Sequence, residues 1–183
     1  MLVGGLPNNL YERVRFWQHL SAAGLINGSY TGIGNTSLGE AIGFQAILFG
    51  FNAPQAKLPR TGFSVYHGSA LNNGGATNWY KHIPNHVLIL GSNDSCDDTG
   101  CLTNNNTITA AESGTTPENA LQLDKKIDDG KPGLGIVTAQ PPDGAFGYYA
   151  QWCTTGTYAQ PELAVYNLSI STPTCPVVFQ SAF

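Results

Sequence analysis

Hydrophobic and polar positions near the start of the chain repeat with the period of an amphipathic helix. From Asn8 to Ile26, apolar residues recur three and four positions apart and most charged residues fall between them. Pro7 suits a first helical turn, and Gly24 and Gly28 offer exits. Trp17 is too large to stay in water, so we expect this helix to pack against a sheet. The predicted packing face consists of Leu10, Val14, Trp17 and Leu20.

The rest of the chain alternates strand-like runs with connections rich in glycine and proline. The stretch from Asn27 to Arg60 has no sustained period, which predicts a long surface connection with at most a short helix or 3₁₀ turn at Pro54 to Lys57. A second helix is predicted from Thr115 to Gly130, with a threonine cap, Pro117 in the first turn and Glu118 at the positive end of the helix dipole. Strands are predicted at Gly62 to Tyr66, His86 to Leu90, Gly135 to Ala139, Tyr148 to Thr154, Glu162 to Ser169 and Pro176 to Gln180.

This order of elements, helix, strands, helix and strands, predicts a single α+β domain over residues 1–183. No internal repeat and no sharp change of composition marks a second domain. A chain of 183 residues can bury about 70% of the surface that it exposes when unfolded, so it can support a hydrophobic core of its own.

The surface of this domain must be covered mainly by neutral polar groups. Charged residues make up 11% of the chain, less than half the usual share of about 25%. The net charge is −4, and neither sign forms a long run, which argues against a nucleic-acid groove or binding to an anionic membrane. Such a surface suits an extracellular protein that packs beside copies of itself, and a secreted binding domain would share it.

Four cysteines, Cys96, Cys101, Cys153 and Cys175, allow three disulfide pairings. No C-x-x-C spacing is present, so a structural zinc site is disfavoured and an oxidising compartment is indicated. We favour pairing between sequence neighbours, Cys96 with Cys101 and Cys153 with Cys175. No run of 18 apolar residues occurs, so we expect that a targeting segment has been cleaved or lies upstream of Met1.

Several stretches resemble the head regions of type IV pilin-like (prepilin-type) proteins, and together they span most of the chain from Phe16 to Gly135. Cys153 and Cys175 also sit where pilin-like heads often close a C-terminal loop by a disulfide. The resembling stretches are Phe16 to Gly32, Gly62 to Val65, Pro117 to Ala120, Leu123 to Pro132, and Gly135.

The resemblance implies a pilin-like head in which the N-terminal helix packs on a twisted antiparallel sheet, with a long connecting loop and a second short helix. It implies a structural subunit, either a pilin, a minor pilin or a pseudopilin, of a type IV pilus or a type II secretion filament. Other pilin subunits would be its partners. Its place would be the bacterial cell surface or an extracellular filament.

The family's N-terminal cleavage site and hydrophobic half-helix have no counterpart in this sequence. In the family, that half-helix anchors the precursor in the inner membrane and later forms the filament core. We therefore expect this chain by itself not to polymerise.

Two groups of acidic residues are candidates for binding Ca²⁺, which prefers carboxylate and carbonyl oxygens. Neither matches an EF-hand loop. We favour the alternative that Asp128 and Asp129 form Asx turns or pair with nearby lysines, and that Asp124 is a buried carboxylate that binds loop amides. The first group is Asp94, Asp97 and Asp98, and the second is Asp124, Asp128 and Asp129.

An adhesive surface is the second functional hypothesis. Aromatic residues near Cys153 could stack on host or surface glycans, which would make the protein a secreted adhesin or carbohydrate-binding module, although such residues more often pack a disulfide loop. We do not expect an enzyme, because the chain has no G-x-S-x-G elbow and no complete dinucleotide-binding loop. The aromatic set is Tyr148, Tyr149, Trp152 and Tyr158.

Overall fold

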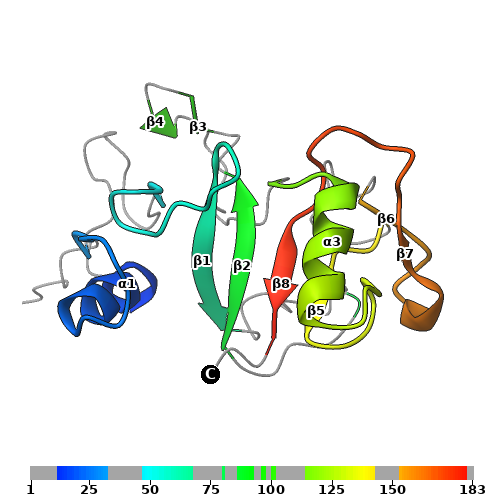
Figure 1. The fold of residues 1–183 in the computed structure, drawn as a ribbon, viewed down its shortest axis with the longest axis horizontal. Coiled ribbons are helices and arrows are strands. Elements are labelled where there is room, and N and C mark those ends of the chain that lie inside the picture. Colours follow the sequence, from blue (N-terminus) through cyan, green and yellow to red (C-terminus); the bar gives the residue numbers. More distant parts are fainter. Residues whose placement is uncertain are drawn as a thin grey trace, which may run out of the picture.

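A computed structural model describes residues 12–32, 47–67, 80, 86–92, 96–97, 100–101, 114–142 and 153–180. These residues form the α+β fold that the sequence predicts, with two α-helices and an antiparallel sheet (Figure 1). In chain order the elements are α1 (Glu12–Ala22), β1 (Thr61–His67), β2 (His86–Ser92), β3 (Cys96–Asp97), β4 (Gly100–Cys101), α3 (Pro117–Ile127), β5 (Val137–Ala139), β6 (Thr154–Thr155), the 3₁₀ helix η3 (Pro161–Leu163), β7 (Val165–Tyr166) and β8 (Val177–Phe179).

The main sheet has four strands in the order β1-β2-β8-β5, and every neighbouring pair is antiparallel. The strand that comes last in sequence, β8, therefore lies inside the sheet. Val178 of β8 is the partner of Ile89 on one side and of Thr138 on the other. All three of these residues are fully buried, so this row of partners marks the middle of the core.

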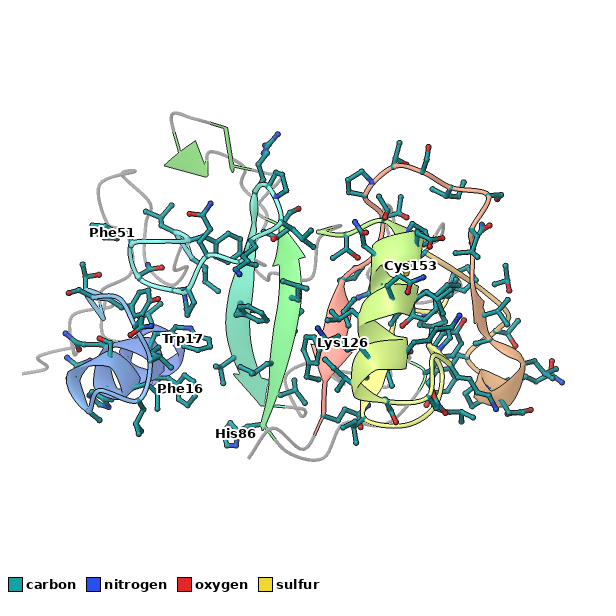
Figure 2. All side chains as sticks on the ribbon, in the orientation of Figure 1. Phe16, Trp17, Phe51, His86, Lys126 and Cys153 are labelled. Carbon is teal, nitrogen blue, oxygen red and sulfur yellow. A yellow bond between two sulfur atoms is a disulfide. The ribbon has the colours of Figure 1, made fainter. Side chains whose placement is uncertain are left out.

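Helix α1 lies beside the β1 side of the sheet (Figures 1 and 2). Trp17 joins Val65 of β1 in one buried cluster, and Leu20 packs partly buried against that cluster. Val14 is fully buried as well. Of the predicted packing face, Trp17 and Leu20 thus lie at the cluster that contains Val65, Val14 is buried, and Leu10 lies outside the described residues.

The connection from α1 to β1 contributes more to the core than the sequence predicts. Ile47 and Ala53 are buried and belong to the same cluster as Trp17, so this part of the connection is not a surface segment. The side chain of the buried Asn52 accepts a hydrogen bond from the backbone N–H of Leu48 at 2.7 Å. That bond closes the turn and satisfies an amide oxygen that would be costly to bury alone.

The short helical turn that the sequence allowed at Pro54 to Lys57 does not form, because Pro54 to Ala56 are extended along the start of β1. Gln55 forms an isolated antiparallel bridge with Gly62. The backbone N–H of Phe63 donates to the carbonyl of Pro54 at 3.0 Å, and that of Ala56 donates to Thr61 at 2.9 Å. Pairing with β1 gives hydrogen-bond partners to backbone N–H and C=O groups that a single helical turn would leave without partners.

Helix α3 begins as its sequence predicts. The hydroxyl of Thr116 accepts a hydrogen bond from the N–H of Asn119 at 3.2 Å, and Pro117 occupies the first turn. Ala120 is fully buried in a second cluster, together with Val137 of β5 and Val177 of β8. The helix thereby covers the β8–β5 side of the sheet (Figure 1). Neither described helix is long and apolar enough to cross a membrane.

Cys153 and Cys175 form a disulfide, as predicted, and both residues are fully buried. The bond connects the start of the β6–β7 hairpin to the segment that leads into β8. The predicted strand from Glu162 to Ser169 is shorter, since it begins with η3 and only Val165–Tyr166 pairs with β6. Cys96 and Cys101 are partners in the β3–β4 register, and their side chains lie outside the described part of the chain.

We predict that Cys175→Ser lowers the free energy of unfolding by about 2–5 kcal/mol, because it removes a cross-link that restricts the unfolded chain. Urea titration of the wild type and the variant measures the difference. The exposed Ser171→Ala is the matched control and should change stability by less than about 0.5 kcal/mol. The double variant Cys153→Ser/Cys175→Ser should resemble the single variant, since the two changes remove one bond. Strictly additive losses would contradict this account.

Candidate functional site

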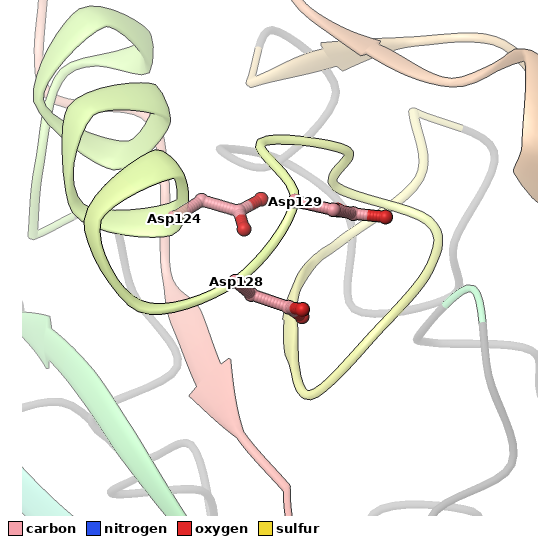
Figure 3. A group of neighbouring side chains, drawn as sticks. All are labelled: Asp124, Asp128 and Asp129. Carbon is pink, nitrogen blue, oxygen red and sulfur yellow. The ribbon is translucent and has the colours of Figure 1, made fainter.

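Three aspartates gather where helix α3 ends and its following loop begins (Figure 3). Asp124 lies in the last turn of the helix, Asp128 caps it, and Asp129 is the next residue. One carboxylate oxygen from each lies within 4.8 Å of the others. Asp124 is buried, Asp128 is half-buried and Asp129 is exposed, so the cluster runs from the core to the surface.

Both oxygens of the Asp124 carboxylate accept hydrogen bonds inside the protein. Its Oδ1 accepts from the backbone N–H of Gly130 at 3.1 Å, and its Oδ2 accepts from the hydroxyl of Tyr166 at 2.9 Å. Tyr166 belongs to β7, 42 residues further along the chain. Asp124 therefore joins α3 to its own loop and to the β6–β7 hairpin.

Asp128 and Asp129 organise the loop that leads into β5. Oδ2 of Asp128 accepts hydrogen bonds from the N–H groups of Ile136 and Val137. Asp129 forms an Asx turn, because its Oδ1 accepts from the N–H of Lys131 at 2.8 Å. Gly135 fits this arrangement, since its φ is 71° and a Cβ atom there would overlap Oδ2 of Asp128.

The electrostatics of the cluster follow from burial and from like charges. Burial raises the pKa of Asp124, and the nearby Asp129 and Asp128 raise it further, while the hydrogen bonds from Tyr166 and Gly130 lower it. Burial also raises the pKa of Tyr166, and the Asp124 charge adds to that effect. The tyrosine therefore remains a proton donor to the carboxylate at neutral pH.

Among the six predicted metal-ligating residues, the structure brings these three together. It describes only the backbone of Asp97, in β3, and Asp94 and Asp98 lie outside the described residues. Asp124 binds a loop amide and Asp129 forms an Asx turn, as interpreted, whereas the printed hydrogen bonds of Asp128 come from amides eight and nine residues further along and not from an Asx turn. Calcium binding by either group stays a prediction.

The predicted adhesive surface can be placed at one residue only. Tyr158 is half-buried and lies in the segment between β6 and η3, whereas Tyr148, Tyr149 and Trp152 lie outside the described residues. Glycan binding therefore also stays a prediction.

Sequence reasoning did not find Tyr166 as a partner of the cluster. In sequence it is one of several tyrosines, and nothing local links it to a carboxylate on a helix 42 residues away. Val165 is exposed and Tyr166 is buried, but both are apolar, so no alternation of polar and apolar residues marks which of the two faces inward. A buried tyrosine hydroxyl needs a partner, but the sequence does not say which one.

Comparison with protein-family models, with curated proteins and with solved structures finds no significant match to this chain. The function must therefore be inferred from the residues and their geometry. Within the described residues, that geometry places three carboxylates where they bind backbone amides and one tyrosine. Such an arrangement fixes the position of a loop, and a group of oxygen ligands of this kind could also accept a hard cation.

The raised pKa of Asp124 predicts how stability depends on pH. Between the unfolded pKa, about 3.9, and the higher folded pKa, the folded state holds more protons, so stability falls as pH rises through this window. Asp124→Asn cannot titrate, and its stability relative to the wild type should therefore increase with pH across the same window. Urea titrations at a series of pH values measure the two curves. Parallel curves would contradict the raised pKa.

Tyr166→Phe tests the Asp124–Tyr166 hydrogen bond by removing its donor. It leaves Oδ2 of a buried carboxylate without its donor, which should cost about 1–3 kcal/mol at neutral pH and less at acidic pH. Tyr30→Phe removes an exposed tyrosine hydrogen bond and is the matched control, with an expected loss below about 0.5 kcal/mol.

Thermal denaturation in calcium and in EDTA tests the cation hypothesis. Because the three carboxylates already accept hydrogen bonds from the protein, we expect the melting temperature to be the same in both. A higher melting temperature in calcium, lost in Asp129→Asn, would instead assign a cation to the cluster, since a ligand that binds only the folded state stabilises it. Asp129 suits this variant because it is exposed and its replacement leaves the buried contacts intact.

Proposed function

We propose that this chain is the head region of a pilin-like protein, a structural subunit of a type IV pilus or a type II secretion filament. The observation that carries the proposal is the way α1 packs beside the sheet. The helix belongs to the stretch from Phe16 to Gly32 that resembles such heads, and it packs through Trp17 beside an antiparallel sheet. This is the arrangement that the resemblance implies.

The loop after α3 supports the same proposal. It lies in the resembling stretch from Leu123 to Pro132, and its acidic residues accept hydrogen bonds from the backbone. Asp124 holds Gly130 and Tyr166, and Asp128 holds the entry to β5. These hydrogen bonds hold the loop in one conformation, which suits a subunit whose role is structural.

The disulfide and the composition add two further supports. Cys153–Cys175 closes the C-terminal segment, as it often does in pilin-like heads, and it indicates an oxidising compartment. Only 11% of the residues are charged, and a surface of neutral polar groups can pack against copies of itself without desolvating many charges.

The test has two stages, beginning with the gene upstream of Met1. The proposal requires a prepilin cleavage site and about 20 apolar residues there, enough to span a membrane. The full precursor is then expressed in a bacterium that assembles such filaments, and incorporation is followed by immunogold electron microscopy.

We expect labelled filaments from the full precursor and none from the present chain alone. His19→Ala, at an exposed position of α1, is the matched control and should be incorporated normally. A plain secretory signal upstream, or a precursor that is processed but never enters filaments, would overturn the proposal. Specific glycan binding by such a protein would favour the adhesin hypothesis instead.

A further inference from the structure

An asparagine followed by a glycine lies in an exposed bend directly after α1. Asn27 and Gly28 belong to the bend of residues 25–28, and both are exposed. Among the residues that the structure describes, neither the side chain of Asn27 nor the N–H of Gly28 has a hydrogen-bond partner. The side-chain carbonyl carbon of Asn27 and the backbone nitrogen of Gly28 are therefore both free to react with each other.

The other asparagines in the described ranges lack this combination. Asn52 is buried, and its side chain accepts a backbone hydrogen bond. Asn119 lies in α3, where the N–H of the next residue, Ala120, is bonded within the helix. Oδ1 of Asn167 accepts two hydrogen bonds from Ser169. Each of these three asparagines also precedes a residue with a Cβ atom, which restricts the backbone more than glycine does.

Glycine at position 28 is required by the shape of this bend. Its φ is 107°, which residues with a side chain rarely adopt, and a Cβ atom there would lie 2.8 Å from the hydroxyl oxygen of Tyr30. The end of the tyrosine side chain therefore lies close against the backbone of Gly28. The Tyr30 side chain packs partly buried against the cluster that contains Trp17, which fixes the position of its hydroxyl.

The hydroxyl of Tyr30 donates a hydrogen bond to the main-chain carbonyl of Asn27 at 3.2 Å. That carbonyl belongs to the same peptide group as the nitrogen of Gly28. When this nitrogen loses its proton, peptide resonance shares the negative charge with the carbonyl oxygen. A donor already directed at that oxygen stabilises the charge as it develops. Tyr30 therefore makes the Gly28 nitrogen easier to deprotonate and a more effective nucleophile.

We propose that Asn27 is a site of spontaneous deamidation and that the Tyr30 hydroxyl promotes the reaction. The Gly28 nitrogen gives its proton to a hydroxide ion and attacks Cγ of Asn27. The C–N bond of the side-chain amide breaks, ammonia leaves with a proton from water, and a succinimide ring remains. Water then opens the ring at one carbonyl or the other, which gives aspartate or isoaspartate. The net reaction consumes water, releases ammonia and needs no oxidant or reductant.

The products change the connection between α1 and the residues after it. Both add a negative charge at position 27, and isoaspartate also adds a methylene carbon to the main chain. The backbone is held on both sides of this position, because Leu25 N–H donates to the carbonyl of Leu20 and Nε2 of Gln18 donates to the carbonyl of Thr31. An extra main-chain atom between these two bonds strains them. This chemistry does not depend on whether the chain is a filament subunit.

Peptide mapping by mass spectrometry, on protein stored in neutral buffer, measures aspartate and isoaspartate at position 27. We expect both products to accumulate in the wild type and to form about three- to tenfold more slowly in Tyr30→Phe, the effect of one hydrogen bond on a rate. Unfolding in urea removes the hydrogen bond, so the two proteins should then react equally fast. Asn73–Gly74, the other Asn-Gly pair of the sequence, is the internal control and should react equally fast in both proteins.

Each remaining outcome overturns the inference. Absence of isoaspartate at position 27 would show that no succinimide forms there. Equal rates in the folded wild type and Tyr30→Phe, or a faster reaction in the variant, would show that the hydroxyl does not promote the reaction. A difference that persists in urea, or that is equally large at Asn73, would have a cause other than the hydrogen bond from Tyr30 to Asn27.

Discussion

The sheet depends on a strand that comes late in the sequence and lies inside the structure. Strand β8 pairs with β2 on one side and β5 on the other, so it joins the half of the molecule that holds α1 to the half that holds α3. Phe63 packs partly buried against both hydrophobic clusters, but the backbone ladder across the two halves runs through β8.

The residues before β8 secure its position. Cys175 is bonded to Cys153, and it also exchanges backbone hydrogen bonds with Thr115 just before α3 begins. One residue thus connects the β6–β7 hairpin, the start of a helix and the entry to the central strand. The Asp124–Tyr166 hydrogen bond connects the other end of α3 to the same hairpin. The hairpin is therefore linked to the start of α3 through Cys175 and to its end through Asp124.

The sequence predicted what depends on local pattern. The period around Trp17 located α1, Thr116 and Pro117 located the start of α3, and the run from Val87 to Leu90 located a buried strand. Predictions failed where distant partners decide the local structure. Pro54 to Ala56 are extended because β1 offers a partner, and η3 replaces the start of a strand because β6 is only two residues long.

In the candidate site, too, local partners could be predicted and distant ones could not. Asx-turn chemistry predicted the hydrogen bond of Asp129, and the position of Asp124 in a helix predicted its bond to a loop amide, because both partners follow within six residues. The amides that Asp128 binds lie eight and nine residues along, and the sequence did not predict them. Tyr166 could not be predicted, since its pairing with Asp124 is a product of how β7 is placed beside α3.

The central place of β8 has a consequence for the order of events after synthesis. Until residues 177–179 are available, the β2 edge and the β5 edge lack their common partner and Val137 lacks its cover. Pairing β2 with β8 closes a loop of some 90 residues, which is entropically slow compared with forming either helix. The four-stranded sheet can therefore be completed only after β8 has been synthesised.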